Sequence, residues 1–365
     1  MPESGEWTTI GENIRQARLG AGMSQASLAD RVALDRTMIA KIESGTRRVD
    51  ALELTRLASA LDVPVDHLLE PMPAVISHRA EPITEDSDTD TARRSQRVQV
   101  VISARLRDVR QLIDAGTLQP TSPLSYHARI ESPEHARDAA RWLRARHGLG
   151  DDPVQSMLEL CERSGQFTLV SELPGDGASL IDGDVAVAVV SSEGDPGRRR
   201  ATAAHELGHL ILGDEYSSDL AVHLSRDDRE SLINAFAAEL LLPLRALRAS
   251  DTGDARTRED LIRVAARYRT SWSLALRQAE LAQWIDASTS RRWQQVTPTR
   301  AEFMEAVGWS PIPDLDGIRV PPGYSHAVME AWRRNLLSDR RAVELLHGSI
   351  SIEELPPRDD EELEP

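Results

Sequence analysis

The stretch from Glu70 to Ser95, EPMPAVISHRAEPITEDSDTDTARRS, limits most strongly how this chain can fold. It is rich in proline, acidic residues, serine and threonine, and it has few side chains that could build a core. This composition predicts a flexible acidic linker over residues 71–95. The 365 residues therefore fold as separate units, in line with the two or three domains that such a length predicts.

Composition limits which cellular compartment and which classes of binding partner suit this chain. The 43 basic and 59 acidic residues give a formal net charge of -16, so bulk electrostatics do not favour binding to nucleic acid or to anionic lipid, and any DNA contact must come from a local patch. The single cysteine, Cys161, excludes an internal disulfide framework and fits a reducing compartment. No stretch approaches the roughly 20 apolar residues that span a bilayer. We therefore expect a soluble, cytoplasmic protein without a membrane partner.

Residues 8–70 are predicted to form a compact all-α domain. Four segments carry apolar residues at helical spacing: IGENIRQARLGAG, SQASLADRVA, DRTMIAKIESG and VDALELTRLASALD. Ser24, Asp35 and Asp50 can cap helices at their N-termini, and Gly22 and Gly45 stand where helices usually end. The sequence thus predicts short helices joined by tight turns.

A second unit over residues 96–287 combines helices with strands. QFTLVSEL and ASLIDGDVAVAVVS are β-branched runs with Asp-Gly between them, and they predict a small antiparallel sheet. Helical periodicity surrounds this sheet on both sides in the sequence, so we expect an α+β domain. Residues 288–365 are predicted to be a helical extension that ends in the acidic tail PPRDDEELEP.

The segment ATAAHELGHLILGDE places His205, Glu206 and His209 on one predicted helix. Positions i and i+4 lie one turn apart on the same face, so the two imidazoles can point at one metal ion. A cation can acidify water and polarise a carbonyl, and Glu206 can take up and return the proton. The helix is otherwise apolar, and two histidines and a glutamate are costly to bury without a function. This pattern also arises by chance, so a third ligand must decide.

Three residues are candidates for that ligand. Glu215 stands where one class of zinc peptidases has a third histidine, but it is not histidine and the glycine of that motif is replaced. His223 lies in a predicted loop. Glu230 opens the helix ESLINAFAAELLLP and shares a face with Asn234, which could support a ligand by hydrogen bonding, whereas Glu239 is half a revolution away and is expected to be solvated. His205, His209 and Glu230 then leave a fourth position open.

The two segments RRRATAAHELGHLILGDE and DDRESLINAFAAELLLP together resemble the ImmA/IrrE family of metallopeptidases over roughly residues 97–287. The resemblance implies a zincin-like α+β fold, metal ligation by His205, His209 and Glu230, and a catalytic carboxylate at Glu206. It also implies a selective protease that cuts a DNA-binding repressor or a regulatory partner. The ligand set suits Zn²⁺, and Mn²⁺ is the alternative.

The segment MSQASLADRVALDRTMIAKIESGTRR resembles the helix-turn-helix of the XRE family of Cro-like and phage-repressor-like regulators. Ile39 and Ile42 are expected to point inward from the second, reading helix. The expected contacts to a double-stranded DNA operator, through base edges or phosphates, are Gln25, Arg36, Thr37, Lys41, Arg47 and Arg48.

Charge leaves an alternative open for this unit. Residues 1–70 contain 8 basic and 11 acidic residues, which is unusual for a DNA-binding domain, so the module could have lost DNA binding and serve in protein interaction. Residues 31–48, however, contain 5 basic against 2 acidic residues, so the positive patch is local to the reading helix. A lone module with few phosphate contacts should bind weakly, and a homodimer on a palindrome is the expected remedy.

Three hypotheses follow for the whole chain, and the third, which the flexible linker suggests, is that the N-terminal module is the peptidase's own cis-regulator or substrate. The leading one is a DNA-binding transcriptional regulator with a metal-dependent endopeptidase domain; the alternative is a non-enzymatic XRE-type repressor or antitoxin whose metal site is structural or sensory. Weaker signals are a second helix-turn-helix at LIRVAARYRTSWSLALRQAEL, more simply explained by packing, and an oxyanion donor at His223 or Tyr268. Cys161 is expected in a core.

Overall fold

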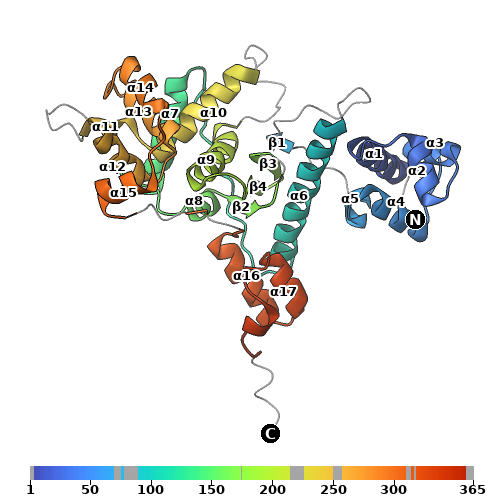
Figure 1. Cartoon of the computed structure of the whole chain (residues 1–365). Coiled ribbons are helices and arrows are strands. Elements are labelled where there is room, and N and C mark those ends of the chain that lie inside the picture. Colours follow the sequence, from blue (N-terminus) through green and yellow to red (C-terminus); the bar gives the residue numbers. More distant parts are fainter. Residues whose placement is uncertain are drawn as a thin grey trace, which may run out of the picture.

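The computed structural model arranges the chain as a small helical unit, a sheet covered by helices, and a further helical layer (Figure 1). No helix in its described ranges is both long and apolar enough to cross a membrane. The structure describes residues 4–69, 75–77, 89–173, 175–213, 226–249, 257–309, 314–315 and 318–358.

Five helices form the N-terminal unit. Ser24 caps the second helix by accepting a hydrogen bond from the Ser27 amide, and Asp50 forms a capping box with Glu53. Ile14, Leu28 and Ile39 are among the apolar side chains that build its separate core. The helices are α1 (Ser4–Gly20), α2 (Gln25–Val32), α3 (Arg36–Glu43), α4 (Ala51–Leu61) and α5 (Val65–Leu69).

The long helix α6 (Thr89–Asp114) connects this unit to the rest of the molecule, and Figure 1 shows it between the two. It contacts α1 on one side and strand β4 (Val185–Ser191) on the other. Val100 packs on the core of the N-terminal unit, whereas Ile102 belongs to a core beneath the sheet. One helix therefore carries apolar contacts to both parts.

The sheet has the order β1-β3-β4-β2 and is mixed. β3 (Gly177–Asp182) and β4 form the expected antiparallel hairpin around Gly183, but β2 (Gln166–Ser171) pairs in parallel with β4. The prediction of a purely antiparallel sheet was wrong, because β2 lies on the far side of β4 and not beside its neighbour in sequence. The short strand β1 (Val75–Ser77) pairs antiparallel with β3.

Both faces of the sheet are covered, and β4 is buried along its whole length. Val187 and Val189 point into a core with α6 and the C-terminal helices α16 (Pro322–Arg333) and α17 (Asp339–Leu345). Ala186 and Val190 alternate with them and point into the opposite core. That opposite face is covered by α7 (Pro133–Arg146), α8 (Met157–Arg163), α9 (Pro196–Leu212) and α10 (Arg226–Leu241).

A fourth core holds the remaining helices together. α12 and α13, proposed above as a second helix-turn-helix, bury apolar faces that include Leu261 and Leu276, and Trp293 of α14 packs with them. Packing, and not DNA recognition, accounts for their apolar residues. These elements are α11 (Leu244–Ala249), α12 (Arg258–Tyr268), α13 (Trp272–Leu281), α14 (Ala287–Gln294) and α15 (Arg300–Val307), and a 3-10 turn follows at Ile352–Glu354.

Candidate metal centre and DNA-reading helix

Helix α9 is defined at both ends by local chemistry. The Asp195 side chain accepts a hydrogen bond from the Arg198 amide at 3.0 Å, and Pro196 occupies the first turn, where its missing N–H costs nothing. Gly213 ends the helix in the left-handed conformation at φ 63°. The intervening residues form a helix whose middle turns are buried, and it carries the HELGH segment.

His205 and His209 lie on the same buried face of α9, as their spacing predicts. Each has only 3% of its surface exposed. Their Nε2 atoms are 3.2 Å apart, and the two rings meet edge to face. Two imidazole nitrogens thus converge on one point in the interior.

Helix α10 places one polar side chain against each nitrogen of the His205 ring. The Glu230 Oε2 atom lies 3.3 Å from His205 Nε2, and the Asn234 Oδ1 atom lies 3.1 Å from His205 Nδ1. The close approach of the helices depends on Gly208, because a Cβ there would lie 2.9 Å from the Ile233 side chain and 3.0 Å from the Phe236 ring. The glycine inside HELGH therefore allows α10 to reach the histidines.

The donor set fits a divalent cation. The ligand atoms of His205, His209 and Glu230 all lie within 4.8 Å of one another. Tetrahedral zinc with Zn–N distances near 2.0–2.1 Å places neighbouring ligand atoms about 3.3 Å apart, close to the 3.2 and 3.3 Å found here. Because the amide oxygen of Asn234 can only accept, His205 Nδ1 donates and its Nε2 presents a lone pair to the centre. Lone pairs and a carboxylate at such short range favour a bound cation.

Glu206 faces the sheet from the same helix. It is 2% exposed, and its Oε2 atom accepts a 2.8 Å hydrogen bond from the Ser179 hydroxyl on β3. Its backbone carbonyl accepts from Gln166 Nε2 on β2 at 3.0 Å. An added Cβ at Gly177 would lie 3.1 Å from Glu206 Oε1, so the strand passes close to the carboxylate. Sequence reasoning missed Ser179, since a serine within a strand carries no signal of its own.

The predictions for the other residues considered at this site compare differently with the structure. Glu239 was expected to be solvated, and this was wrong: it is 1% exposed, and it accepts hydrogen bonds from the Leu244 amide at 3.2 Å and from Arg141 at 3.4 Å. Burial raises the pKa of the Glu239 carboxyl. Tyr268 is a core residue whose hydroxyl donates to the Asp151 carbonyl, so it is not an oxyanion donor. Glu215 and His223 lie outside the described residues.

Cys161 is a core residue, as expected. It is 0% exposed, and burial raises the pKa of its thiol to about 12, so it stays protonated and unreactive at neutral pH.

On α3, the helix expected to read DNA, the outer and inner faces are separated as predicted. Arg36, Thr37 and Lys41 are exposed, whereas Ile39 and Ile42 are buried against the other helices. The three polar side chains thus form one accessible face, which a major groove could receive.

The residues expected to contact phosphates differ in whether their side chains are already paired within the protein. Arg47 forms an ion pair with Glu53 at 2.6 Å, and Gln25 donates a hydrogen bond at 2.8 Å to Glu43, which is itself paired with buried Arg18. These side chains must exchange protein partners before they can contact a phosphate.

Arg48, by contrast, is exposed. It can approach DNA without giving up any of these ion pairs.

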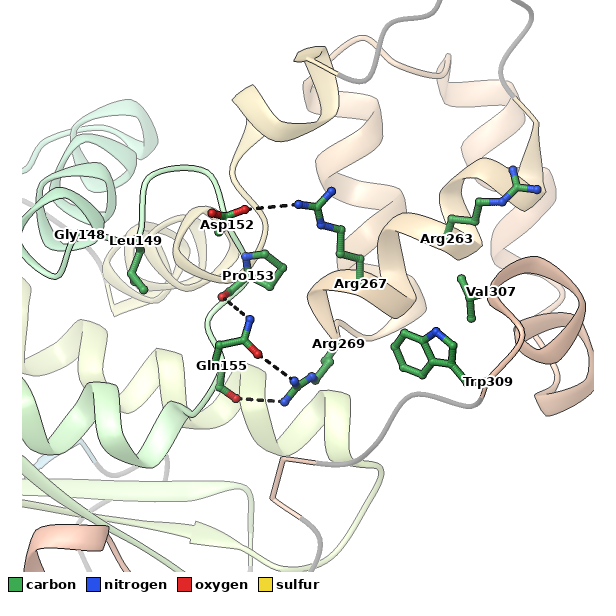
Figure 2. A pocket seen from close by; sticks show the side chains of 10 residues that line it. All are labelled: Gly148, Leu149, Asp152, Pro153, Gln155, Arg263, Arg267, Arg269, Val307 and Trp309. Atoms are coloured by element: carbon green, nitrogen blue, oxygen red, sulfur yellow. Dashed lines mark hydrogen bonds and ion pairs between the residues drawn. The ribbon is translucent and has the colours of Figure 1, made fainter.

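A separate pocket of about 550 Å³ lies beside α12 and contains none of the metal-site residues (Figure 2). Arg269 reaches across it and donates to the Gln155 carbonyl at 3.0 Å and to the Gln155 side chain at 3.1 Å. Arg267 lies 3.3 Å from Asp152. These contacts tie α12 to the segment before α8, and they account for the arginines as packing groups.

Two family models match the chain. A helix-turn-helix model covers residues 14–68, and the peptidase M78 model described as "IrrE N-terminal-like domain" covers residues 175–280. The first begins within α1 and covers α2, α3, α4 and most of α5, and the second spans β3, β4, α9 and α10 together with α12 and most of α13. Both matches fall on the segments whose motifs indicated these families.

Individual relatives match over shorter stretches. The "Uncharacterized transcriptional regulator in ATPase CF(0) region" of Rhodospirillum rubrum is 36% identical over 73 residues, which cover 18% of this chain and 68% of the relative. The "Uncharacterized HTH-type transcriptional regulator R00410" of Rhizobium meliloti is 38% identical over 64 residues, 18% of this chain and 46% of that protein. The similar regulator y4aM of Sinorhizobium fredii is 36% identical, and this chain spans 45% of its length.

Among solved structures, Bacillus thuringiensis PlcR in complex with the peptide PapR7 and DNA aligns over 93% of this chain and 91% of PlcR, at 10% identity and a TM-score of 0.19. A score this low supports no inference about fold or function. The family models and the R. rubrum relative carry the assignment. The chain belongs to the XRE-type helix-turn-helix transcriptional regulators and carries, on the same polypeptide, an IrrE-like domain of peptidase family M78.

Proposed function

We propose that the chain is a DNA-binding regulator whose second domain is a metal-dependent endopeptidase acting on a repressor or another regulatory protein. The observation that carries this proposal is the convergence of His205, His209 and Glu230 within 4.8 Å, with Glu206 buried on the same helix. Three ligands from two helices leave room for water and substrate, as catalytic metal sites require.

His205, His209 and Glu230 would hold a divalent cation, Zn²⁺ or alternatively Mn²⁺. When bound, such a cation acidifies water and polarises the scissile carbonyl. Glu206 would accept the proton of the attacking water and pass it to the leaving amine. The 2.8 Å hydrogen bond from Ser179 holds one carboxylate oxygen of Glu206, so the other is the proton acceptor. Asn234 would orient the His205 ring.

The helix-turn-helix unit would bring this activity to an operator. Arg36, Thr37 and Lys41 form the exposed face of α3 and are proposed to contact base edges. Gln25, Arg47 and Arg48 are proposed to contact phosphates. The proposed partners are a double-stranded operator, a substrate protein encoded by a nearby gene and a second copy of the chain, which would form a homodimer on a palindromic site. Because the protein would act at a DNA operator, its proposed compartment is the cytoplasm.

The peptidase proposal is tested with the Glu206→Gln variant and a Glu159→Gln control, since Glu159 is an exposed glutamate on α8. Metal-loaded wild type, variant and control are incubated with the proteins encoded by adjacent genes, and the products are identified by mass spectrometry. We expect one discrete cleavage by the wild type and the control. In the variant, the rate should fall by about 100-fold or more with metal still bound. Equal cleavage by all three would refute the role of Glu206.

DNA binding is tested by selecting an operator from a random duplex library and measuring its affinity for Lys41→Ala and for a matched Arg56→Ala control on α4. Lys41→Ala should weaken binding by about 1–3 kcal/mol if it contacts a base. No selected sequence, or an unchanged affinity, would contradict DNA reading by α3. A wild type that binds its operator, holds metal and cleaves no partner would support the non-enzymatic alternative.

A further inference from the structure

The chain's own linker contributes a strand beside the metal centre. β1 lies next to β3 at the edge of the sheet (Figure 1), with Val75 opposite Leu180 and Ser77 opposite Ser179. Ser179 is the residue whose hydroxyl donates to Glu206. β1 also contacts α9, the helix that carries Glu206 and both histidines. Residues 75–77 therefore pair with the strand that positions the proposed catalytic carboxylate.

The edge of β3 is a natural place for an extended peptide. A strand edge presents unpaired N–H and C=O groups, and an added strand satisfies them through its backbone. The opposite side of β3 is paired with β4 from Gly177 to Asp182, so an incoming segment can pair only on the side where β1 lies. A substrate segment bound there would run past Glu206.

The pairing of β1 is short and irregular. The register slips between Val75 and Ser77, which lie opposite adjacent residues of β3, and the two pairs cover only Ser179 and Leu180. Gly177, where an added Cβ would lie 3.1 Å from Glu206 Oε1, has no partner in this register. Such a contact is easily displaced, and it leaves Gly177 of β3 without a partner in β1.

We propose that residues 75–77 are an intramolecular competitor, which occupies the substrate edge of β3 without being cut and yields to an extended, unfolded segment of the substrate protein. This rests on the proposed peptidase function. The same residues belong to the linker between the DNA-binding unit and α6, and α6 itself packs on α1 of that unit.

The proposal is tested in the full chain carrying Glu206→Gln, so that no readout depends on catalysis. Ile76→Pro and, as a second variant, Val75→Pro should disrupt the strand, because proline fixes φ and has no backbone N–H. Thr84→Pro, in the same linker but outside β1, is the control. Hydrogen exchange is followed in peptides covering residues 177–182. Exchange should be about tenfold faster in both β1 variants and unchanged in the control. Equal exchange in all four proteins would overturn the proposal.

A binding measurement gives the second arm. A fluorescent synthetic peptide of residues 71–80, PMPAVISHRA, is titrated into the Glu206→Gln chain and into its Ile76→Pro derivative. A tethered competitor acts at an effective concentration near millimolar, so its removal should tighten peptide binding by about tenfold. Equal affinities would overturn competition. So would accumulation, in the metal-loaded wild type, of a fragment ending within residues 71–80, because the linker would then be a substrate.

The two proposals fail separately. If Glu206→Gln cleaves a partner as fast as the wild type, the catalytic role of Glu206 is lost, yet exchange and peptide binding still report on the edge of β3. If exchange and binding do not respond to Ile76→Pro, the competitor is lost while the catalytic assignment stands.

Discussion

Substitution of Asn234 gives a specific test of the proposed metal centre, because one atom of its side chain contacts the proposed ligand His205. Its Oδ1 atom lies 3.1 Å from Nδ1 of His205, whose side chain is 4% exposed. Asn234→Ala removes the acceptor and leaves a buried N–H without it, at a cost of about 1–3 kcal/mol. The ring can then rotate or change tautomer, and loss of such a supporting partner lowers metal affinity by about 10–100-fold.

The assay is a competition titration of the metal against a chromophoric chelator of known affinity. Asn234→Asp is the matched variant, since a carboxylate oxygen at the same place also accepts from Nδ1 and should preserve the affinity. Global stability measured in the presence of chelator separates unfolding from metal loss. An affinity for Asn234→Ala within twofold of the wild type would refute the view that this hydrogen bond orients His205.

Three further predictions concern packing, charge and pH. Gly208→Ala should weaken metal binding in the same titration, because its Cβ would lie 2.9 Å from α10 and push that helix from the histidines; unchanged affinity contradicts this. Glu43→Gln should lower the free energy of unfolding by about 3 kcal/mol in urea, because it leaves the Arg18 guanidinium buried without its anion. Burial lowers the pKa of His67 to about 4, so the folded state binds fewer protons than the unfolded state between pH 4 and 6.5. Stability should therefore fall on acidification by up to about 1.4 kcal/mol per pH unit, and His67→Gln should flatten that slope in pH-dependent denaturation.

The local parts of the fold were predictable from sequence because local chemistry specifies them. Ser24 and Asp50 cap helices as expected, and the Asp-Gly signal marks the β3–β4 hairpin. The parallel pairing of β2 with β4 was not predictable, because it depends on which side of the hairpin the earlier strand joins. Strand β1 was missed for a related reason: three residues inside a polar linker carry no periodicity, and only the edge of β3 makes them a strand.

The proposed metal site likewise has features that were predictable from sequence and features that were not. The i, i+4 spacing brings His205 and His209 together within one helix, and helical phase places Glu230 and Asn234 on one face of the next. The distance between the two helices is a tertiary property, which Gly208 permits. Glu239 shows the limit of phase arguments. It does lie on a different face from Glu230, yet α7 and the start of α11 cover that face, so the residue is buried instead of solvated.

Binding of one divalent metal ion by His205, His209 and Glu230 together can be measured by native mass spectrometry after a chelator challenge. Wild type, Glu230→Gln and Asp227→Asn are compared, the last being an exposed acidic residue on the same helix. We expect one metal ion per chain in the wild type and in Asp227→Asn, and loss of the ion from Glu230→Gln. Retention of the ion by Glu230→Gln as tightly as by the wild type, or a wild type that binds none, would contradict it.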